Sequence, residues 1–271
     1  MHQPSDTQNN TEVAPEPVDL EALRPKISKY FRIKWYVDLA VMIITLPIIG
    51  STILLFMLLT KLTSKGPVIY TQTRCSKDGK PFKMYKIRSM VVDAEAGKGA
   101  VWAKGMKDPR ITTVGRIMRK LHIDELPQIY NVWKGEMNVI GPRPERPEFV
   151  AKLSKDVPGY EYRMLVLPGM TGLAQLNLPA DSGMEDVRKK LVLDFEYIER
   201  ASFFYDMRIL AGTAFKFIRT KYFDRLPLRL CGICINPQDS PWAAKIGLLD
   251  DHESVHLNPE NAPQSTKNTT E

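Results

Sequence analysis

The chain is organised around residues 121–148, which read LHIDELPQIYNVWKGEMNVIGPRPERPE. This stretch places two adjacent carboxylates, Asp124 and Glu125, where a helix is expected to begin. Arg143 follows between two prolines, and each proline restricts the backbone beside it. A carboxylate pair followed by a guanidinium on a stiff backbone is suited to handling phosphate groups.

Asp124 and Glu125 have a structural interpretation and a chemical one. Asp124 has the short polar side chain of a helix N-cap, and Pro127 and Gly135 predict the first turn and the end of that helix. The helix dipole stabilises such carboxylates whether or not they take part in chemistry. In the chemical interpretation, the helix N-terminus keeps Asp124 ionised as a nucleophile and presents amides to a bound phosphate. Two close carboxylates also suit Mg²⁺, which takes one or two carboxylates together with substrate phosphates.

Further candidate phosphate-binding side chains come from the neighbouring sequence. The fixed backbone prepares Arg143 for bidentate phosphate contact, and Arg146 either assists it or pairs with a nearby glutamate at the surface. Residues 68–74 and 82–88 are β-prone, and the Asp-Gly turn between them predicts a hairpin. Four polar side chains of this hairpin either face an anion or lie solvated at its edge: Gln72, Arg74, Lys86 and Arg88.

The composition limits the class of partner. The chain has 271 residues, 44% of them hydrophobic, and a net charge of +7, which indicates an anionic partner such as a phosphate substrate or a membrane surface. No nucleic-acid partner is expected, because aromatic and basic residues do not combine in a nucleic-acid motif. Three cysteines argue against a secreted disulfide framework, and the CxxC pair Cys231 and Cys234 lacks the further ligands of a metal site.

Residues 39–59 contain no ionisable group, and this length of apolar sequence is enough to enter or cross a bilayer. Pro47, followed by Gly50, predicts a kink or break in the helix. Basic residues flank both ends of the run, whereas a single span normally carries its Lys/Arg excess on one side. This balance favours a helix that enters the membrane, turns at Pro47 and returns to the cytoplasmic face, over a plain span or a buried soluble helix.

The remaining segments predict surface helices and tails. Residues 111–121, 191–198 and 206–218 show helical periodicity, and the first and third fit either a lipid surface or a protein core. Residues 1–20 have the composition of a disordered tail. Residues 223–271 form a C-terminal extension whose segment 242–249 is expected to dock on the body, while its end is disordered.

Three ordered motifs together resemble the bacterial sugar transferase family, the monotopic polyprenyl-phosphate phosphoglycosyl transferases. They are KIRSM at 86–90, the run from DPRITTVG to GPRPERPEFV at 108–150, and PGMTGLAQLN at 168–177. The resemblance runs from about Arg32 to Arg219. It implies a helix-rich α+β fold, with one re-entrant membrane helix, amphipathic surface helices and a small β-hairpin in a cytoplasmic globule on the bacterial inner membrane. The expected division is 1–20 tail, 21–64 membrane-association helix, 65–222 transferase domain and 223–271 extension.

The resemblance also implies a reaction and roles for its residues. A sugar 1-phosphate passes from a nucleotide diphosphosugar, usually a UDP-sugar, to polyprenyl phosphate in a Mg²⁺-dependent ping-pong reaction. Asp124 corresponds to the nucleophile and to a ligand of the metal, Glu125 to the residue that assists the second step or places the metal, and Arg143 to the phosphate-binding arginine. A membrane-anchored assembly protein without catalysis, or a hydrolase of the diphosphate, remains an alternative.

The sequence departs from the family pattern in four places. Leu46 precedes Pro47 where serine is frequent, and His122 stands where serine or threonine is common, which we interpret as a packing variation. Leu167 precedes Pro168 where arginine is frequent, and Leu178-Pro179 stands where Gly-Arg is frequent. The last two lie in the part expected to meet the nucleotide-sugar, so no relative's sugar preference can be transferred to this chain.

Overall fold

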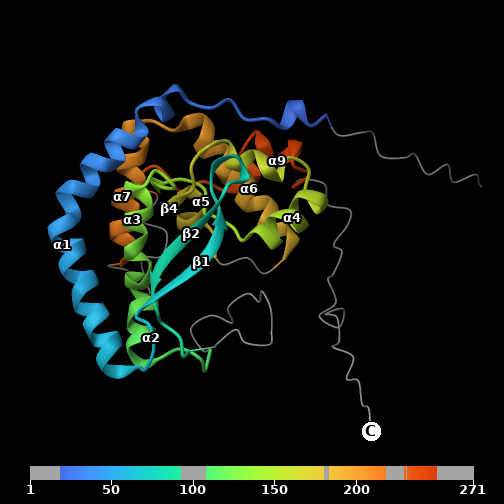
Figure 1. Cartoon of the computed structure of the whole chain (residues 1–271). Helices are drawn as coiled ribbons and strands as arrows, with labels where there is room; N and C mark the ends of the chain where they lie inside the picture. The colour runs from blue at the N-terminus through green and yellow to red at the C-terminus, as the bar shows by residue number, and fades with distance from the viewer. Residues whose placement is uncertain (1–18, 93–107, 180–182, 218–228, 230, 249–271) are drawn as a thin grey trace, which may run out of the picture.

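The computed structural model describes residues 19–92, 108–179, 183–217, 229 and 231–248. The described chain is a helix-rich α+β fold, as predicted (Figure 1). It has two small sheets: the predicted hairpin and a second, parallel sheet that the sequence did not predict. Most of the tail predicted at 1–20 and the end of the extension predicted at 223–271 lie outside the described residues.

The apolar run forms one long helix, α1 (Lys34–Thr63), which is long and apolar enough to cross a membrane. Only 6% of its most apolar window is buried within the protein. The helix continues through Pro47, so the predicted break does not occur. Instead α1 arcs along one side of the molecule, and on its inner side lie α2 (Thr113–Lys120), α3 (Ile129–Trp133) and α7 (Phe203–Phe217) (Figure 1). Side-chain hydroxyls bond to helix carbonyls on both sides of the proline, from Thr45 to Val41 (2.8 Å) and from Ser51 to Pro47 (2.6 Å).

The first turn of α1 is fixed to the globule by buried charges. The Lys34 ammonium donates to Asp38 (3.1 Å) and to Asp206 (2.5 Å) of α7 (Phe203–Phe217). Asp38 also accepts the amide of Val139 (3.1 Å), in strand β3 (Asn138–Ile140). Asp206 also accepts the hydroxyl of Tyr197 (2.9 Å), in α6 (Met184–Arg200). One network therefore joins four elements from three separate regions of the sequence: the start of α1, β3, and the consecutive helices α6 and α7.

The predicted hairpin is confirmed. Strand β1 (Ile69–Cys75) pairs antiparallel with β2 (Pro81–Ile87), and Tyr70 lies opposite Lys86. Asp78 and Gly79 adopt left-handed backbone conformations (φ 56° and 71°), which aspartate tolerates and glycine favours, so the turn forms where the sequence predicted it.

A second sheet leads into the start of the GPRP motif, residues 141–144. Strand β3 pairs in parallel with β4 (Gly169–Thr171). A Cβ added at Gly169 would lie 2.0 Å from the backbone nitrogen of Gly141, so only glycine permits the two segments to approach this closely.

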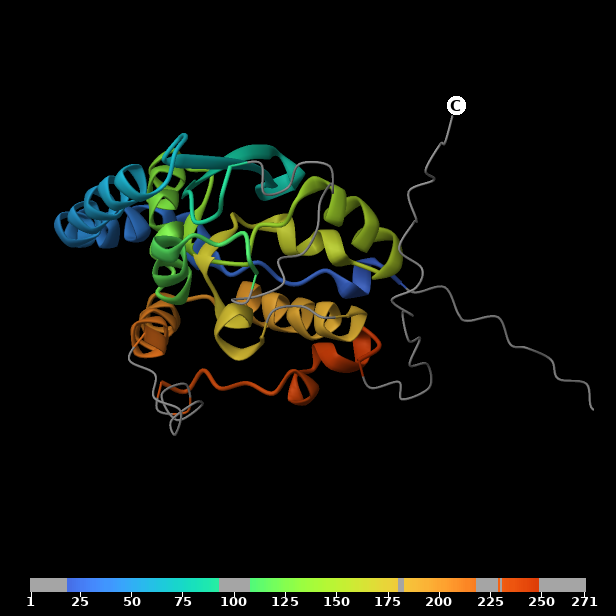
Figure 2. The ribbon, with the colours of Figure 1, turned by 90° about the horizontal axis from the view of Figure 1, so that it is seen from below.

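The core is built around α6, which is buried along most of its length. Trp242 of α9 (Trp242–Lys245) packs edge-on against Phe195 of α6, with ring centroids 5.1 Å apart, as predicted for docking of this segment (Figure 2). The remaining elements are α2 (Thr113–Lys120), α3 (Ile129–Trp133), α4 (Pro147–Asp156), α5 (Leu173–Asn177) and the 3-10 turns η1 (Glu21–Leu23), η2 (Lys29–Arg32), η3 (Lys77–Gly79), η5 (Ile123–Gln128), η6 (Tyr160–Leu165) and η7 (Pro237–Asp239).

The two predicted amphipathic helices each have a core side and an exposed side. In α2, Met118 is fully buried whereas Ile117 is 51% exposed. In α7, Ile209 is fully buried whereas Phe204 is 75% exposed. The apolar residues on the outer side leave membrane-surface contact available to both helices, in addition to core packing.

Candidate active site

A left-handed residue determines how the two carboxylates are presented. After α2, the backbone of His122 has φ 51°, a conformation in which histidine is enriched among non-glycine residues. The chain then forms the 3-10 turn η5 and continues into α3, which is followed by Gly135 (φ 72°). The prediction that Asp124 is the N-cap is wrong: His122 occupies the cap position, since the chain reverses there, and Asp124 lies within the first turn.

Asp124 is almost fully buried, with 7% of the residue exposed. One carboxylate oxygen accepts the hydroxyl of Ser89 (3.3 Å), which follows β2. Burial and then the charge of Glu125 raise the pKa of Asp124, while the charges of Lys86 and Arg119 oppose the rise. This direction is opposite to the one that the helix-dipole argument predicted, because loss of solvation outweighs the favourable charges.

Glu125 is held by two cations. One of its oxygens accepts both the Lys86 ammonium (2.8 Å) and an Arg143 nitrogen (2.8 Å), and its other oxygen lies 3.4 Å from the second Arg143 nitrogen. Burial opposes ionisation here, but the charges of Arg143 and Lys86 hold the pKa of Glu125 well below its ordinary value. The pKa values of the neighbouring carboxylates therefore shift in opposite directions, which is typical of groups with separate chemical roles.

The structure brings together Asp124, Glu125 and Arg143 as the sequence predicted, and it adds Lys86. The sequence grouped Lys86 with the other hairpin side chains, which either face an anion or lie solvated at the edge. Lys86 lies near the end of β2, opposite Tyr70, and this position places its ammonium beside Glu125, which is 39 residues away in sequence. Ser89 was not predicted, although it belongs to the same KIRSM run.

The other predicted side chains lie elsewhere. Arg88 donates to the carbonyl (2.9 Å) and hydroxyl (3.1 Å) of Ser64, just after α1 ends. Arg74 donates to Gln72 (2.6 Å) and to the carbonyl of Pro144 (3.0 Å), so these two side chains brace the GPRP loop. Arg146 forms a 3.7 Å ion pair with the exposed Glu148. Of the two predicted roles of Arg146, this is the pairing with a surface glutamate and not assistance to Arg143.

One carboxylate in the site, that of Asp124, is available to bind a magnesium ion. Among the described residues, no group of three or more His, Cys, Asp or Glu side chains is placed to hold a metal. Lys86 and Arg143 engage the oxygens of Glu125, whereas Asp124 is contacted by a neutral hydroxyl. A single carboxylate fits Mg²⁺ because this ion takes the rest of its ligands from substrate phosphates and water.

Comparison with known proteins places the chain among sugar transferases. The chain is similar to a Bacillus subtilis (strain 168) protein whose name provisionally assigns it undecaprenyl-phosphate N-acetylgalactosaminyl 1-phosphate transfer (49% identity over 142 residues, 52% of this chain and 78% of the relative). It is 41% identical over 191 residues (70% of this chain) to the UDP-N-acetylgalactosamine-undecaprenyl-phosphate N-acetylgalactosaminephosphotransferase of Aeromonas hydrophila. It is also 39% identical over 181 residues (66% of this chain) to the UDP-glucose:undecaprenyl-phosphate glucose-1-phosphate transferase of Escherichia coli (strain K12). The chain spans 44% and 39% of the lengths of these last two relatives. Residues 29–220 match the bacterial sugar transferase family over most of the chain, and the protein therefore belongs to that family.

Proposed function

We propose that this protein transfers a sugar 1-phosphate from a UDP-sugar to polyprenyl phosphate and so initiates assembly of a surface glycan. The observation that carries the proposal is that the two neighbouring carboxylates have different partners, which suits them to different roles. Glu125 is paired with Lys86 and Arg143, while Asp124 is contacted by the Ser89 hydroxyl. Relatives named for transfer from UDP-sugars to undecaprenyl phosphate support the choice of donor and acceptor.

The first step makes an aspartyl intermediate. A carboxylate oxygen of Asp124 attacks the β-phosphorus of the UDP-sugar, the bond from that phosphorus to the bridging oxygen breaks, and UMP leaves with the oxygen. The phosphosugar is then bound to Asp124 as an acyl phosphate. Arg143 and Lys86 lie beside the carboxylate pair, where their charges stabilise the phosphoryl oxygens during transfer.

The second step releases the product. A phosphate oxygen of polyprenyl phosphate attacks the same phosphorus, the bond to Asp124 breaks, and the carboxylate is regenerated together with polyprenyl diphosphosugar. Glu125 acts as the orienting group that keeps Lys86 and Arg143 directed at the transferred phosphate. Asp124 and the substrate phosphates would hold Mg²⁺, which would further neutralise the phosphate charge.

The experiment that tests this function incubates the detergent-solubilised protein with Mg²⁺, polyprenyl phosphate and a panel of UDP-sugars, and it measures UMP release. We expect UMP with at least one sugar, together with a lipid-linked product that depends on the acceptor. A folded protein that releases no UMP with any sugar would overturn the proposal and favour a membrane-anchored assembly protein. UMP without a lipid product would instead favour hydrolysis.

We also propose that both ends of α1 lie on the cytoplasmic face. Supporting this, both ends of the helix bond to the same globule: Lys34 contacts Asp206, and Ser64 accepts Arg88. A helix of 30 residues is about 45 Å long, so a straight span would carry one of these ends across the bilayer. The curve of α1 around the globule is compatible with a helix that enters one leaflet and returns.

Single cysteines test this topology on a background in which all three native cysteines, Cys75, Cys231 and Cys234, are replaced by serine or alanine. We expect cysteines at positions 32 and 65 to react with an impermeant maleimide only when the cytoplasmic face is accessible. Labelling of the two positions from opposite faces would establish a plain span instead.

The pH dependence of the reaction tests the ionisation of Asp124. Its carboxylate is the nucleophile only when ionised, so activity falls as pH decreases through its pKa, which burial and Glu125 raise. Lys86 opposes that rise, and Lys86→Met should therefore move the acidic limb of kcat/KM to higher pH. The exposed neighbour Lys83→Met is the matched control and should leave the limb in place. An unshifted limb in Lys86→Met would show that the limb does not report Asp124.

A further inference from the structure

The loop that carries Arg143 is held by donors from outside itself. Pro142 and Pro144 have no N–H and cannot donate a backbone hydrogen bond, so the loop contributes few donors of its own. Its four successive carbonyls nevertheless each accept a hydrogen bond: Pro142 from the Gly169 amide (2.8 Å), Arg143 from Arg163 (3.0 Å), Pro144 from Arg74 (3.0 Å) and Glu145 from the Cys75 amide (2.8 Å). Two of these four donors are side chains, so substitution can remove them individually.

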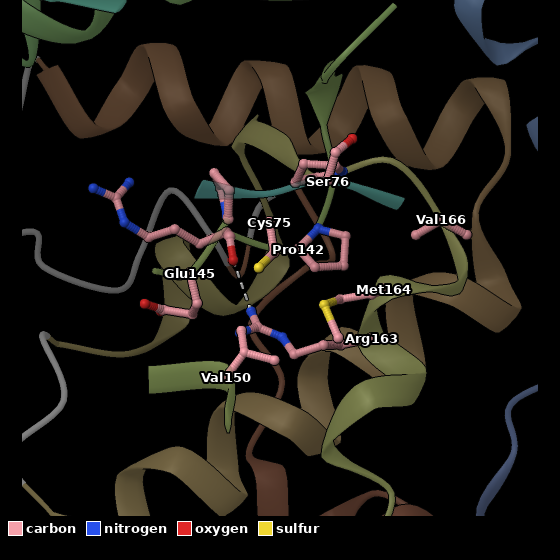
Figure 3. Close-up of a pocket in the computed structure, with 11 residues that line it drawn as sticks. Cys75, Ser76, Pro142, Glu145, Val150, Arg163, Met164 and Val166 are labelled. Carbon is pink, nitrogen blue, oxygen red and sulfur yellow. Dashed lines mark hydrogen bonds between the residues drawn. The ribbon is translucent and has the colours of Figure 1, made fainter. Parts of the chain in front are cut away.

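Arg163, in η6, is the more rigid of the two side-chain donors. It is 3% exposed, and its guanidinium is bonded on three sides. Asp194 of α6 accepts from Nε (2.9 Å) and lies 2.7 Å from Nη2, while Nη1 donates to the hydroxyl of Tyr160 (2.8 Å). Nη2 also donates to the carbonyl of Arg143, the bond drawn as a dashed line in Figure 3. A planar guanidinium fixed in this way can hold its acceptor in one position.

The cavity between Arg163 and the loop is too small for a substrate. It is lined by Cys75, Pro142, Glu145 and Met164 among others (Figure 3), and its volume is about 10 Å³. That volume is at most enough for one water molecule. Arg163 therefore lies behind the loop as a support and does not line a binding pocket.

We propose that Arg163 is a positioning residue for the transfer reaction: it fixes the Arg143–Pro144 peptide plane, so that the Arg143 side chain points to Glu125 and to the donor phosphate. This inference rests on the proposed function, in which Arg143 binds that phosphate. The amide side of this peptide belongs to a proline and cannot be anchored by a hydrogen bond, so the carbonyl is the anchor. A displacement of about 1 Å at a phosphate-binding group can reduce a rate by about 10²-fold.

A double-mutant cycle between Arg163 and Arg143 tests the inference. Arg163→Lys retains the charge, but a single ammonium cannot bond to Asp194, Tyr160 and the loop carbonyl in the same geometry. We expect it to raise KM for the UDP-sugar and to lower kcat/KM by about 10–100-fold. In a background of Arg143→Ala, the same substitution should cost less than about 3-fold, because no side chain remains to be positioned. Additive losses in the double variant would overturn the inference.

Two further variants separate positioning from folding. Tyr160→Phe removes a bond to Arg163 but leaves the loop carbonyl bonded, and it should keep kcat/KM within about 3-fold of the wild type. The paired replacement Arg163→Met with Asp194→Leu removes the buried ion pair as a whole, which is often tolerated for stability, and leaves the Arg143 carbonyl without its donor. It should unfold near the wild-type temperature but share the kinetic defect of Arg163→Lys. A stable, fully active paired variant would refute the inference.

The same double-mutant cycle can be measured on UDP binding: calorimetry gives the UDP affinity of the wild type and of each variant, and it requires no turnover. Weaker binding in Arg163→Lys, absent in the Arg143→Ala background, supports positioning even if the sugar or acceptor has been chosen wrongly. Equal UDP affinity in wild type and Arg163→Lys overturns it. Absence of UMP release from the wild type bears on the proposed function alone.

Discussion

Asp124→Asn should abolish both UMP release and the covalent phosphosugar adduct, with turnover reduced by at least about 10³-fold. The substitution preserves shape, and the amide oxygen can still accept the Ser89 hydroxyl that now bonds to the carboxylate. What is lost is the anionic oxygen that attacks phosphorus, since a neutral amide is a very poor nucleophile. The neighbouring Glu125 should not replace it, because its oxygens are paired with Lys86 and Arg143.

Mass spectrometry of the protein incubated with the donor but no acceptor measures the adduct directly. The wild type should gain the mass of a phosphosugar on the peptide that contains Asp124, and Asp124→Asn should gain none. Asp156→Asn is the control, because Asp156 is an exposed carboxylate at the end of α4. An adduct on another residue in the Asp124→Asn protein would reassign the nucleophile.

Asp206→Ala should lower the free energy of unfolding by about 3–5 kcal/mol, the typical cost of removing one partner of a buried ion pair. Asp206 is 1% exposed and accepts both the Lys34 ammonium and the Tyr197 hydroxyl. Removing it leaves the buried ammonium with Asp38 and takes from the buried Tyr197 hydroxyl the shorter of its two bonds, so that the carbonyl of Ile140 (3.2 Å) remains as its acceptor. For a protein of this size, the unfolding temperature should fall by roughly 10 °C.

Thermal unfolding in detergent, followed by circular dichroism, measures this loss. Asp156→Asn again serves as the control, since exposed substitutions usually change stability by less than about 0.5 kcal/mol. Because the network fixes the start of α1, Asp206→Ala should also increase proteolysis near residue 33. An Asp206→Ala protein that unfolds at the wild-type temperature would show that the network contributes no net stability.

Short-range sequence patterns predicted the local elements well. The Asp78-Gly79 turn and the β-prone residues on either side of it predicted the hairpin, because the backbone preferences of a turn are set by the residues within it. The apolar run predicted α1, since its length and lack of charge are sufficient for a membrane helix. The prediction of a kink or break at Pro47 was wrong as to the break: the helix is not interrupted there, and α1 as a whole is curved.

The contacts of individual charged side chains were harder to predict. Arg74, Lys86 and Arg88 come from one hairpin and looked equivalent in sequence, yet they bond to the GPRP loop, to Glu125 and to the end of α1 respectively. Their partners lie 70, 39 and 24 residues away, at distances in sequence where no periodicity applies. Strand register and the packing of η5 against β2 select the partner, and both depend on the whole fold.

The sequence by itself determined that this chain has a hairpin, a long apolar helix and a carboxylate pair followed by a proline-flanked arginine. These features follow from local backbone preference, hydrophobicity and the chemistry of side chains close together in the chain. Only the tertiary structure decided that burial raises the pKa of Asp124, that Lys86 and Arg143 share Glu125, and that Arg163 supports the loop from behind. Desolvation and long-range ion pairs depend on which distant segments pack together, and no stretch such as 121–148 contains that information alone.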